Sequence, residues 1–150
     1  LAAGKLLGLP VFSWRKSSFL GRVRQCYLDI KAGTLGGLVI EEGAFRRRKA
    51  YIGASKILKI YRDGIIVKDK NDVVWVRRLP QGEISLKDFL SRADLVYGEG
   101  EVISDLFFDD DLNIVGGEIS GGFWRDISRG RGFCSWQKLS EKTKLQENGR

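Results

Sequence analysis

Residues 29–40 read DIKAGTLGGLVI, and residues 109–119 repeat the same order of residue types as DDDLNIVGGEI. Both stretches contain an aspartate, a turn, an aliphatic residue, a Gly-Gly pair and a second aliphatic residue. The match extends upstream, where Gly21-Arg22-Val23 corresponds to Gly100-Glu101-Val102 after a one-residue gap. An ordered match at a constant spacing indicates an internal repeat, and a glycine pair within a strand marks the close approach of a neighbouring backbone or ring. We therefore expect two related β units.

The residues around the first copy read as a succession of short strands. Asp63-Gly64 between two apolar runs is a strong hairpin signal. The four consecutive cations Arg46, Arg47, Arg48 and Lys49 place two on each face of their strand, which is expected to be an edge strand protected by charge. Apolar runs bounded by turn residues predict strands over 10–14, 21–30, 35–40, 46–52, 57–61, 65–67 and 73–76.

The second half of the chain begins after a turn at Pro80-Gln81-Gly82. Ser85-Leu86-Lys87-Asp88 fits a helix-start capping box, and Phe89 and Leu90 continue the apolar face of Leu86. One short helix is therefore expected over 85–93. Further strands are predicted over 95–97, 102–108 and 114–117, and the polar segment 141–150 reads as a tail.

Histidine is absent from the 150 residues, and this excludes several classes of site. No Ser-His-Asp triad, Cys-His dyad or imidazole-ligated metal can form. The two cysteines, Cys26 and Cys134, cannot build a zinc site alone. One disulfide between them is an alternative to the interpretation that we favour, two free thiols in a reducing cytoplasm. No apolar stretch approaches the roughly 20 residues of a membrane span.

Charge is divided unevenly along the chain. Residues 1–80 contain 17 Lys/Arg and 6 Asp/Glu, whereas residues 81–150 contain 9 and 13, so that the net charge is +7. A basic half raises the affinity for phosphates, anionic surfaces or acidic proteins. It also allows the two halves to attract each other, within one chain or between the chains of a homo-oligomer.

The order of these elements resembles the PRC-barrel family, which is named for the photosynthetic reaction-centre H subunit and shared with the C-terminal domain of the ribosome maturation factor RimM. In the first copy the resemblance is carried by Leu7-Gly8-Leu9-Pro10-Val11-Phe12, Leu20-Gly21-Arg22-Val23, Tyr27-Leu28-Asp29, Leu38-Val39-Ile40, the strand 48–52 and the segment 55–60. In the second copy it is carried by the segments 100–109 and 118–127, followed by Gly130-Arg131. These are similar to the second domain of tandem PRC-barrel proteins from bacteria.

The resemblance implies an all-β fold, with small, mostly antiparallel barrels in tandem and one short helix between the units. The domains it implies are a first barrel over 4–79 and a divergent second barrel over 83–140, followed by the tail 141–150. It implies no catalytic site, cofactor or metal common to the family. Known members serve as assembly or docking modules for proteins, some of them near membranes or ribosomes.

Three motifs have some features of catalytic or ligand-binding sites, and each lacks a requirement. Asp109-Asp110-Asp111 has the acidic spacing of a calcium loop, but Ile114 and Ser120 stand where glycine and glutamate are needed, so a solvated hairpin turn is predicted. Ser120 lies outside any Gly-x-Ser-x-Gly elbow and has no histidine base, and we interpret it as a turn hydroxyl. The glycine-rich segments 98–100 and 129–132 open no helix that would bind a phosphate.

Two basic clusters remain as candidate binding sites. Arg46, Arg47, Arg48 and Lys49 either protect an edge strand or form a docking patch for RNA, lipid headgroups or an acidic protein. Arg129 and Arg131 either contact a nucleic acid together with nearby aromatic rings or surround a core made by those rings, the interpretation that we favour. The rings are those of Phe123, Trp124, Phe133 and Trp136, and Trp14 and Trp75 are predicted to be core or interface anchors.

The sequence therefore predicts a cytoplasmic, non-enzymatic interaction module without a cofactor. It is expected to dock a protein partner through a barrel surface, with the cluster Arg46–Lys49 steering an acidic one. The alternative is an RNA- or ribosome-associated assembly factor related to RimM, although residues 1–9 leave no room for the separate N-terminal domain of RimM. Peripheral membrane contact is a further alternative for the basic cluster, and an enzyme of unrecognised type is the third hypothesis.

Overall fold

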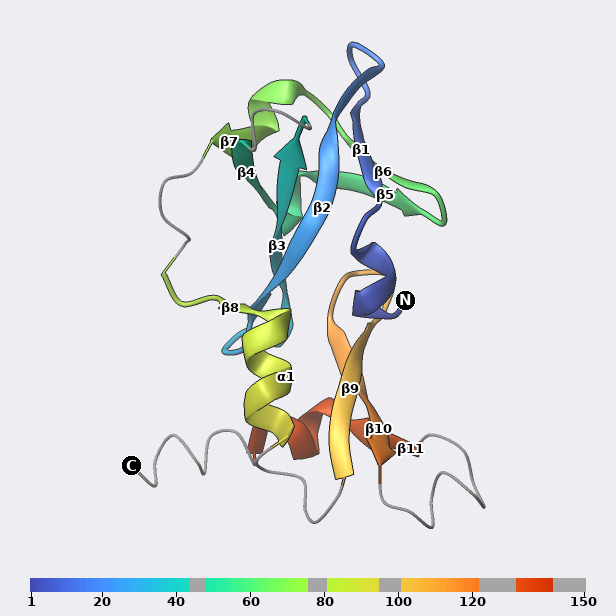
Figure 1. Ribbon diagram of the computed structural model, residues 1–150, viewed down its shortest axis with the longest axis vertical. Coiled ribbons are helices and arrows are strands. Elements are labelled where there is room, and N and C mark those ends of the chain that lie inside the picture. The colour runs from blue at the N-terminus through green and yellow to red at the C-terminus, as the bar shows by residue number, and fades with distance from the viewer. Residues whose placement is uncertain (44–47, 76–80, 95–100, 122–131, 142–150) are drawn as a thin grey trace.

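The computed structural model describes residues 1–43, 48–75, 81–94, 101–121 and 132–141 (Figure 1). This part of the chain forms two β-sheets with a helix between them. The strands are β1 (Pro10–Ser13), β2 (Ser18–Asp29), β3 (Thr34–Glu42), β4 (Arg48–Gly53), β5 (Ile57–Tyr61), β6 (Gly64–Val67), β7 (Val73–Trp75), β8 (Ile84–Ser85), β9 (Glu101–Phe108), β10 (Ile114–Gly121) and β11 (Gly132–Ser135). The helical elements are the 3-10 turns η1 (Ala3–Leu6), η2 (Ala54–Lys56) and η3 (Lys70–Asp72), the α-helix α1 (Leu86–Asp94) and residues 136–141.

The larger sheet has the strand order β5-β6-β1-β2-β3-β4-β7, and β8 pairs with β2. Its neighbouring strands are antiparallel except for β1 and β6, which run parallel. The smaller sheet is the antiparallel meander β9-β10-β11. The prediction of a mostly β, mostly antiparallel fold is confirmed, as is the hairpin at Asp63-Gly64, which joins β5 to β6.

Three details differ from the sequence-based expectations. Among the described residues the larger sheet does not close into a barrel, because β5 and β7 each pair with one strand. The strand of the basic cluster, β4, is not an edge strand, because β7 pairs with it. The local sequence pattern did not predict this pairing, since β7 comes from a later segment of the chain. Residues 136–141 add a second helix, in which Leu139 is buried. The predicted strand 95–97 lies outside the described residues.

Both glycine pairs lie against aromatic rings, as their sequence context predicted. A Cβ atom at Gly37 would overlap the ring of Tyr51, and one at Gly116 would overlap the ring of Phe133. In each sheet the ring comes from the next strand and from a position diagonal to the glycine, since Tyr51 pairs with Val39 and Phe133 pairs with Glu118. Glycine at these positions therefore allows a ring to pack closely against the neighbouring strand.

One hydrophobic core runs through both sheets, and α1 completes it. The predicted N-cap is present, since the Ser85 Oγ accepts a hydrogen bond from the Asp88 backbone N–H at 3.1 Å. The apolar face of α1 presents Phe89, which is fully buried, toward β2 and β9, as Figure 1 shows for the helix. Leu6 of η1 and Leu106 of β9 are also fully buried in this cluster. Burial of these apolar side chains is the main favourable contribution to folding.

The turns that precede the two glycine pairs contact each other. The Leu35 N–H donates to the Leu112 carbonyl at 2.9 Å, and the Ile114 N–H donates to the Gly33 carbonyl at 2.8 Å. Thr34 and Asn113 form the bridge between them. The two sheets are therefore joined by backbone pairing at this point as well as by apolar packing.

The aromatic residues only partly follow their predicted positions. Trp136 packs against the core, with its ring 5.8 Å from that of Phe89. Phe133 was expected in the core, but its exposed fraction is 57%, and Trp14, predicted to be a core or interface anchor, is 71% exposed and so is not part of the core. Phe133 is at the sheet edge over Gly116, and Trp14 follows the last residue of β1, where no element covers it among the described residues. Phe123, Trp124 and the side chain of Trp75 lie outside the described residues.

Candidate docking surface

The basic cluster is only partly described by the structure. Arg48 and Lys49 are exposed on β4, whereas Arg46 and Arg47 lie outside the described residues, as do Arg129 and Arg131. In the register of β3 and β4, Arg48 lies opposite Glu42 and Lys49 lies opposite Glu41. Opposite charges on directly facing residues attract each other and lower the local positive potential. Arg48 and Lys49 therefore each lie opposite an acidic residue of β3. The sequence alone did not predict this, because it does not give the register of the two strands.

A second cationic surface lies on the outward side of β5, β6, β1 and β2. We call it the outer aromatic face and define it by Phe12, Phe19, Arg22, Lys59 and Tyr61. Phe12 and Phe19 are cross-strand partners whose ring centroids are 5.8 Å apart. The Arg22 guanidinium lies 5.9 Å from the centre of the Phe19 ring, and the Lys59 Nζ lies 5.0 Å from that of Tyr61. Each cation is thus held against a ring that remains partly exposed.

Strand alternation explains why these five side chains share a face. Val11, Ile65 and Val67 point inward and are fully buried, so Phe12 and Ile66 between them point outward. Ile66 pairs with Lys59 on one side and with Phe12 on the other. This face is built by the parallel pairing of β1 and β6, which joins segments more than 50 residues apart. Sequence reasoning missed it because each strand contributes only one or two residues to this face, and the strands are brought together by long-range pairing.

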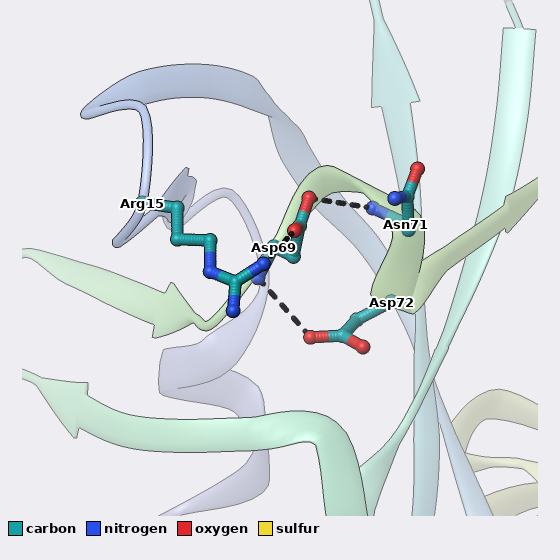
Figure 2. A network of polar contacts seen from close by, with 4 residues as sticks. All are labelled: Arg15, Asp69, Asn71 and Asp72. Carbon is teal, nitrogen blue, oxygen red and sulfur yellow. Dashed lines mark hydrogen bonds and ion pairs between the residues drawn. The ribbon is translucent and has the colours of Figure 1, made fainter.

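The turn between β1 and β2 is anchored beside this face by polar contacts (Figure 2). The Arg15 guanidinium donates to Asp69 Oδ2 at 3.2 Å, and the Asp69 Oδ1 accepts from the Asn71 backbone N–H at 3.3 Å. The Asp69 backbone N–H donates in turn to Asp72 Oδ2 at 3.1 Å, which completes the capping box of η3. The hydrogen bond from Asn71, and to a smaller extent Arg15, lower the pKa of Asp69.

We expect the Asp69→Asn variant to lose stability in a pH-dependent way. Because the Asp69 pKa is lower in the folded chain than its ordinary value of 3.8, the charged carboxylate stabilises the fold above that pH. This contribution is lost as the pH falls through the folded-state pKa. Urea unfolding of wild type and variant should differ at pH 6 and converge below pH 4. A difference that stays constant down to pH 2 would show that the charge of Asp69 does not contribute.

A cavity of about 790 Å³ runs along β5 on the side away from β6. All five residues of β5 line it, and the opposite wall comes from the N-terminal residues, Phe107 of β9 and the following turn. Its aliphatic lining consists of Leu1, Ala2, Leu9, Ile57, Leu58, Ile60 and Leu112. Its charged lining consists of Lys5, Lys59, Arg62, Asp109 and Asp110. The cavity and the outer aromatic face therefore share Lys59 and Tyr61.

A partly buried polar contact between Tyr51 and Glu83 stabilises the fold. The Tyr51 hydroxyl lies 2.7 and 2.8 Å from the two Glu83 carboxylate oxygens and 3.0 Å from the Gly36 carbonyl. Burial, and then the hydrogen bond with Glu83, raise the pKa of Tyr51, so its hydroxyl stays protonated at physiological pH. This contact attaches the segment that precedes α1 to β3 and β4.

The Tyr51→Phe variant should be less stable than wild type by about 1–2 kcal/mol, because a hydrogen bond to a charged group is lost and the ring is kept. The change in unfolding free energy can be measured by urea denaturation. Tyr61→Phe is the control, since the Tyr61 ring is half exposed and contacts Lys59. Equal stabilities of the Tyr51→Phe variant and wild type would show that the Glu83 contact contributes nothing.

The remaining residues that the sequence offered as candidates for chemistry are Cys26, Cys134, Asp109 and Ser120, and each of them is part of the folded structure. Burial raises the pKa of the Cys26 thiol to about 12, and Cys134 is buried as well, both as free thiols. The Asp109 carboxylate accepts hydrogen bonds from the Asp111 and Asn113 backbone N–H groups, each at 2.9 Å, which confirms the predicted hairpin turn. Ser120, expected in a turn, lies within β10 opposite Val102. Residues 1–43, 48–75, 81–94, 101–121 and 132–141 contain no group of three His, Cys, Asp or Glu residues that could hold a metal ion.

Fold and surface together define a small β-sheet module that presents aromatic and cationic side chains on a partly exposed sheet face. Residues 1–74 match the PRC-barrel domain, so this half of the chain belongs to the PRC-barrel family, as its sequence motifs suggested. The chain is also similar to the uncharacterized protein YrrD of Bacillus subtilis (strain 168). The two are 26% identical over 127 residues, which cover 81% of this chain and 70% of YrrD. No helix in the described part of the chain is long and apolar enough to cross a membrane.

Proposed function

We propose that this chain is a non-enzymatic docking module that binds an acidic protein partner through the outer aromatic face. The observation that carries the proposal is the pair of exposed rings, Phe19 and Tyr61, each with a cation held against it. Aromatic residues and arginine supply most of the binding energy at protein interfaces. Cations at such a surface also accelerate the encounter with an acidic partner.

The arrangement of the two halves supports this proposal. We propose that residues 4–79 form the docking unit and that residues 83–140 form a second unit that supports it. The second unit contacts η1 and β2 through β9 and α1, and its Phe107 and Leu112 line the same cavity as Lys59 and Tyr61 of the outer aromatic face. A partner bound to the outer aromatic face would therefore lie beside the second unit.

The proposal is tested by capture of partners from the lysate of the source cell with tagged wild type and two charge-reversed variants. We expect Arg22→Glu to reduce the captured partner about tenfold, because like charges facing an acidic surface repel. Lys87→Glu, on the exposed side of α1, makes the same charge change away from the face and should capture as wild type does. Phe19→Ala should also weaken capture, because it removes the ring and keeps the charge. Undiminished capture by both Arg22→Glu and Phe19→Ala would contradict the proposal.

The same capture distinguishes the other candidate surfaces. Charge reversal of Arg46, Arg47 and Arg48 tests whether the basic cluster takes part in docking. A second candidate function is RNA association, which is favoured by the alternation of rings and cations on the outer aromatic face. Partners that disappear after RNase treatment, and RNA binding that falls steeply with added salt, would support it over a protein partner.

A further inference from the structure

We propose that β5 is an acceptor strand, and that the cavity along it takes an extended peptide segment in which acidic and apolar residues alternate. The segment would pair with β5 as an additional strand of the larger sheet. This inference rests on the proposed docking function, since it describes how part of the acidic partner is held. It assigns to the partner a chemistry that neither the sequence motifs nor the outer aromatic face specify.

The first argument is the free edge of β5. Among the described residues β5 pairs with β6 and with no other strand, so its second edge presents backbone N–H and C=O groups toward the cavity. Leu58 has no Cα partner in β6, because the pairing shifts between Ile57 and Lys59, and its exposed fraction is 56%. Such an edge recognises any extended chain through main-chain hydrogen bonds. A nucleic acid or a lipid headgroup cannot satisfy alternating donors and acceptors in this way.

The second argument is the shape of the space beside that edge. The cavity follows the whole of β5, and its volume of about 790 Å³ is within the range of pockets that hold ligands. Its other wall is formed by Leu1, Phe107 and the turn after β9. A strand added to β5 would therefore lie between β5 and this wall. A short segment held there would have its side chains partly buried.

The third argument is the alternation of side chains along β5. Ile57 and Ile60 are half-buried and pack against the core, whereas Lys59 is exposed on the outer aromatic face. A residue paired with a strand residue lies on the same face of the sheet. The segment residue opposite Lys59 would therefore be acidic, and the residue opposite Ile60 would be apolar. Among the charged residues that line the cavity, the cations Lys5, Lys59 and Arg62 outnumber the carboxylates Asp109 and Asp110.

The test uses the full chain and a synthetic peptide, Glu-Val repeated four times. Binding is measured by fluorescence anisotropy of a labelled peptide and by the shifts of ¹⁵N-labelled backbone amides. We expect amide shifts along β5 and saturable binding. The same peptide with N-methylated valines should bind about tenfold more weakly, because backbone donors are removed while the side chains are kept. This comparison leaves the protein unchanged, so it does not depend on the folding of a variant.

Protein variants test the same edge from the other side. Leu58→Pro removes a backbone N–H of β5 and restricts its backbone, and should weaken binding about tenfold, whereas Leu58→Ala keeps the N–H and should change binding less. The inference is overturned if the peptide does not bind, if N-methylation has no effect, or if the amide shifts fall on Phe12 and Phe19 and leave β5 unchanged. The proposed function fails separately, when partner capture is insensitive to Arg22→Glu and Phe19→Ala. A partner captured through those residues with no peptide binding at β5 would retain the docking function and reject this inference.

Discussion

The Phe89→Ala variant should lose about 3–5 kcal/mol of unfolding free energy, the range for removing a fully buried aromatic ring. Phe89 is fully buried and packs 5.8 Å from the ring of Trp136, ring centre to ring centre. Its helix contacts β2 of the larger sheet and β9 of the smaller one. The cavity left by this substitution would therefore lie where the two sheets meet. A loss of this size is a large share of the total stability of a small protein.

Urea denaturation followed by circular dichroism measures this loss. Leu90→Ala is the matched control on the same helix, because Leu90 is only partly buried against the core and should cost less. The continuous core also predicts one cooperative transition in wild type, with both sheets unfolding together. If Phe89→Ala cost no more than Leu90→Ala, the packing of α1 between the two sheets would be contradicted.

The Gly21→Ala variant is expected to have the second large effect, a loss of about 3 kcal/mol from backbone strain and overlap together. Gly21 has a φ of +151°, and a Cβ atom there would lie 2.7 Å from the Glu41 carbonyl oxygen. This oxygen belongs to the backbone of β3, so relief of the overlap would require β2 and β3 to separate. Both strands lie in the middle of the larger sheet.

Gly8→Ala separates the two causes of that loss. Gly8 has a φ of +84°, and a Cβ atom there would have nothing within 4 Å. Its substitution should cost only the conformational penalty of about 1–2 kcal/mol. The excess for Gly21→Ala then measures the overlap with β3 together with the different backbone conformation at Gly21, where φ is +151° instead of +84°. Equal losses at the two glycines would mean that β3 can move aside at little cost.

The sequence predicts those parts of the fold that depend on neighbouring residues. The hairpin at Asp63-Gly64, the N-cap at Ser85 and the rings over Gly37 and Gly116 all follow from patterns within a few residues or from one adjacent strand. The PRC-barrel family was also identified from the order of these local motifs.

Contacts between distant segments could not be predicted in this way. β1 pairs with β6 and β4 pairs with β7, so the outer aromatic face, the cavity along β5 and the internal position of β4 all depend on long-range pairing. The prediction that Phe133 is buried was wrong for a related reason. Phe133 has the chemistry of a core residue, but it lies on β11 over Gly116 and is 57% exposed. Hydrophobicity alone does not determine which ring is covered.

The pairing of the two turns has a consequence for the kinetics of folding. Each hairpin closes a short loop, whereas the hydrogen bonds from Leu35 to Leu112 and from Ile114 to Gly33 join residues that are distant along the chain. The entropic cost of loop closure rises with loop length, so the hairpins form before the turns meet. The amide protons of Leu35 and Ile114 therefore report on the docking of one sheet onto the other. Their hydrogen exchange separates undocking of the sheets from the opening of either hairpin.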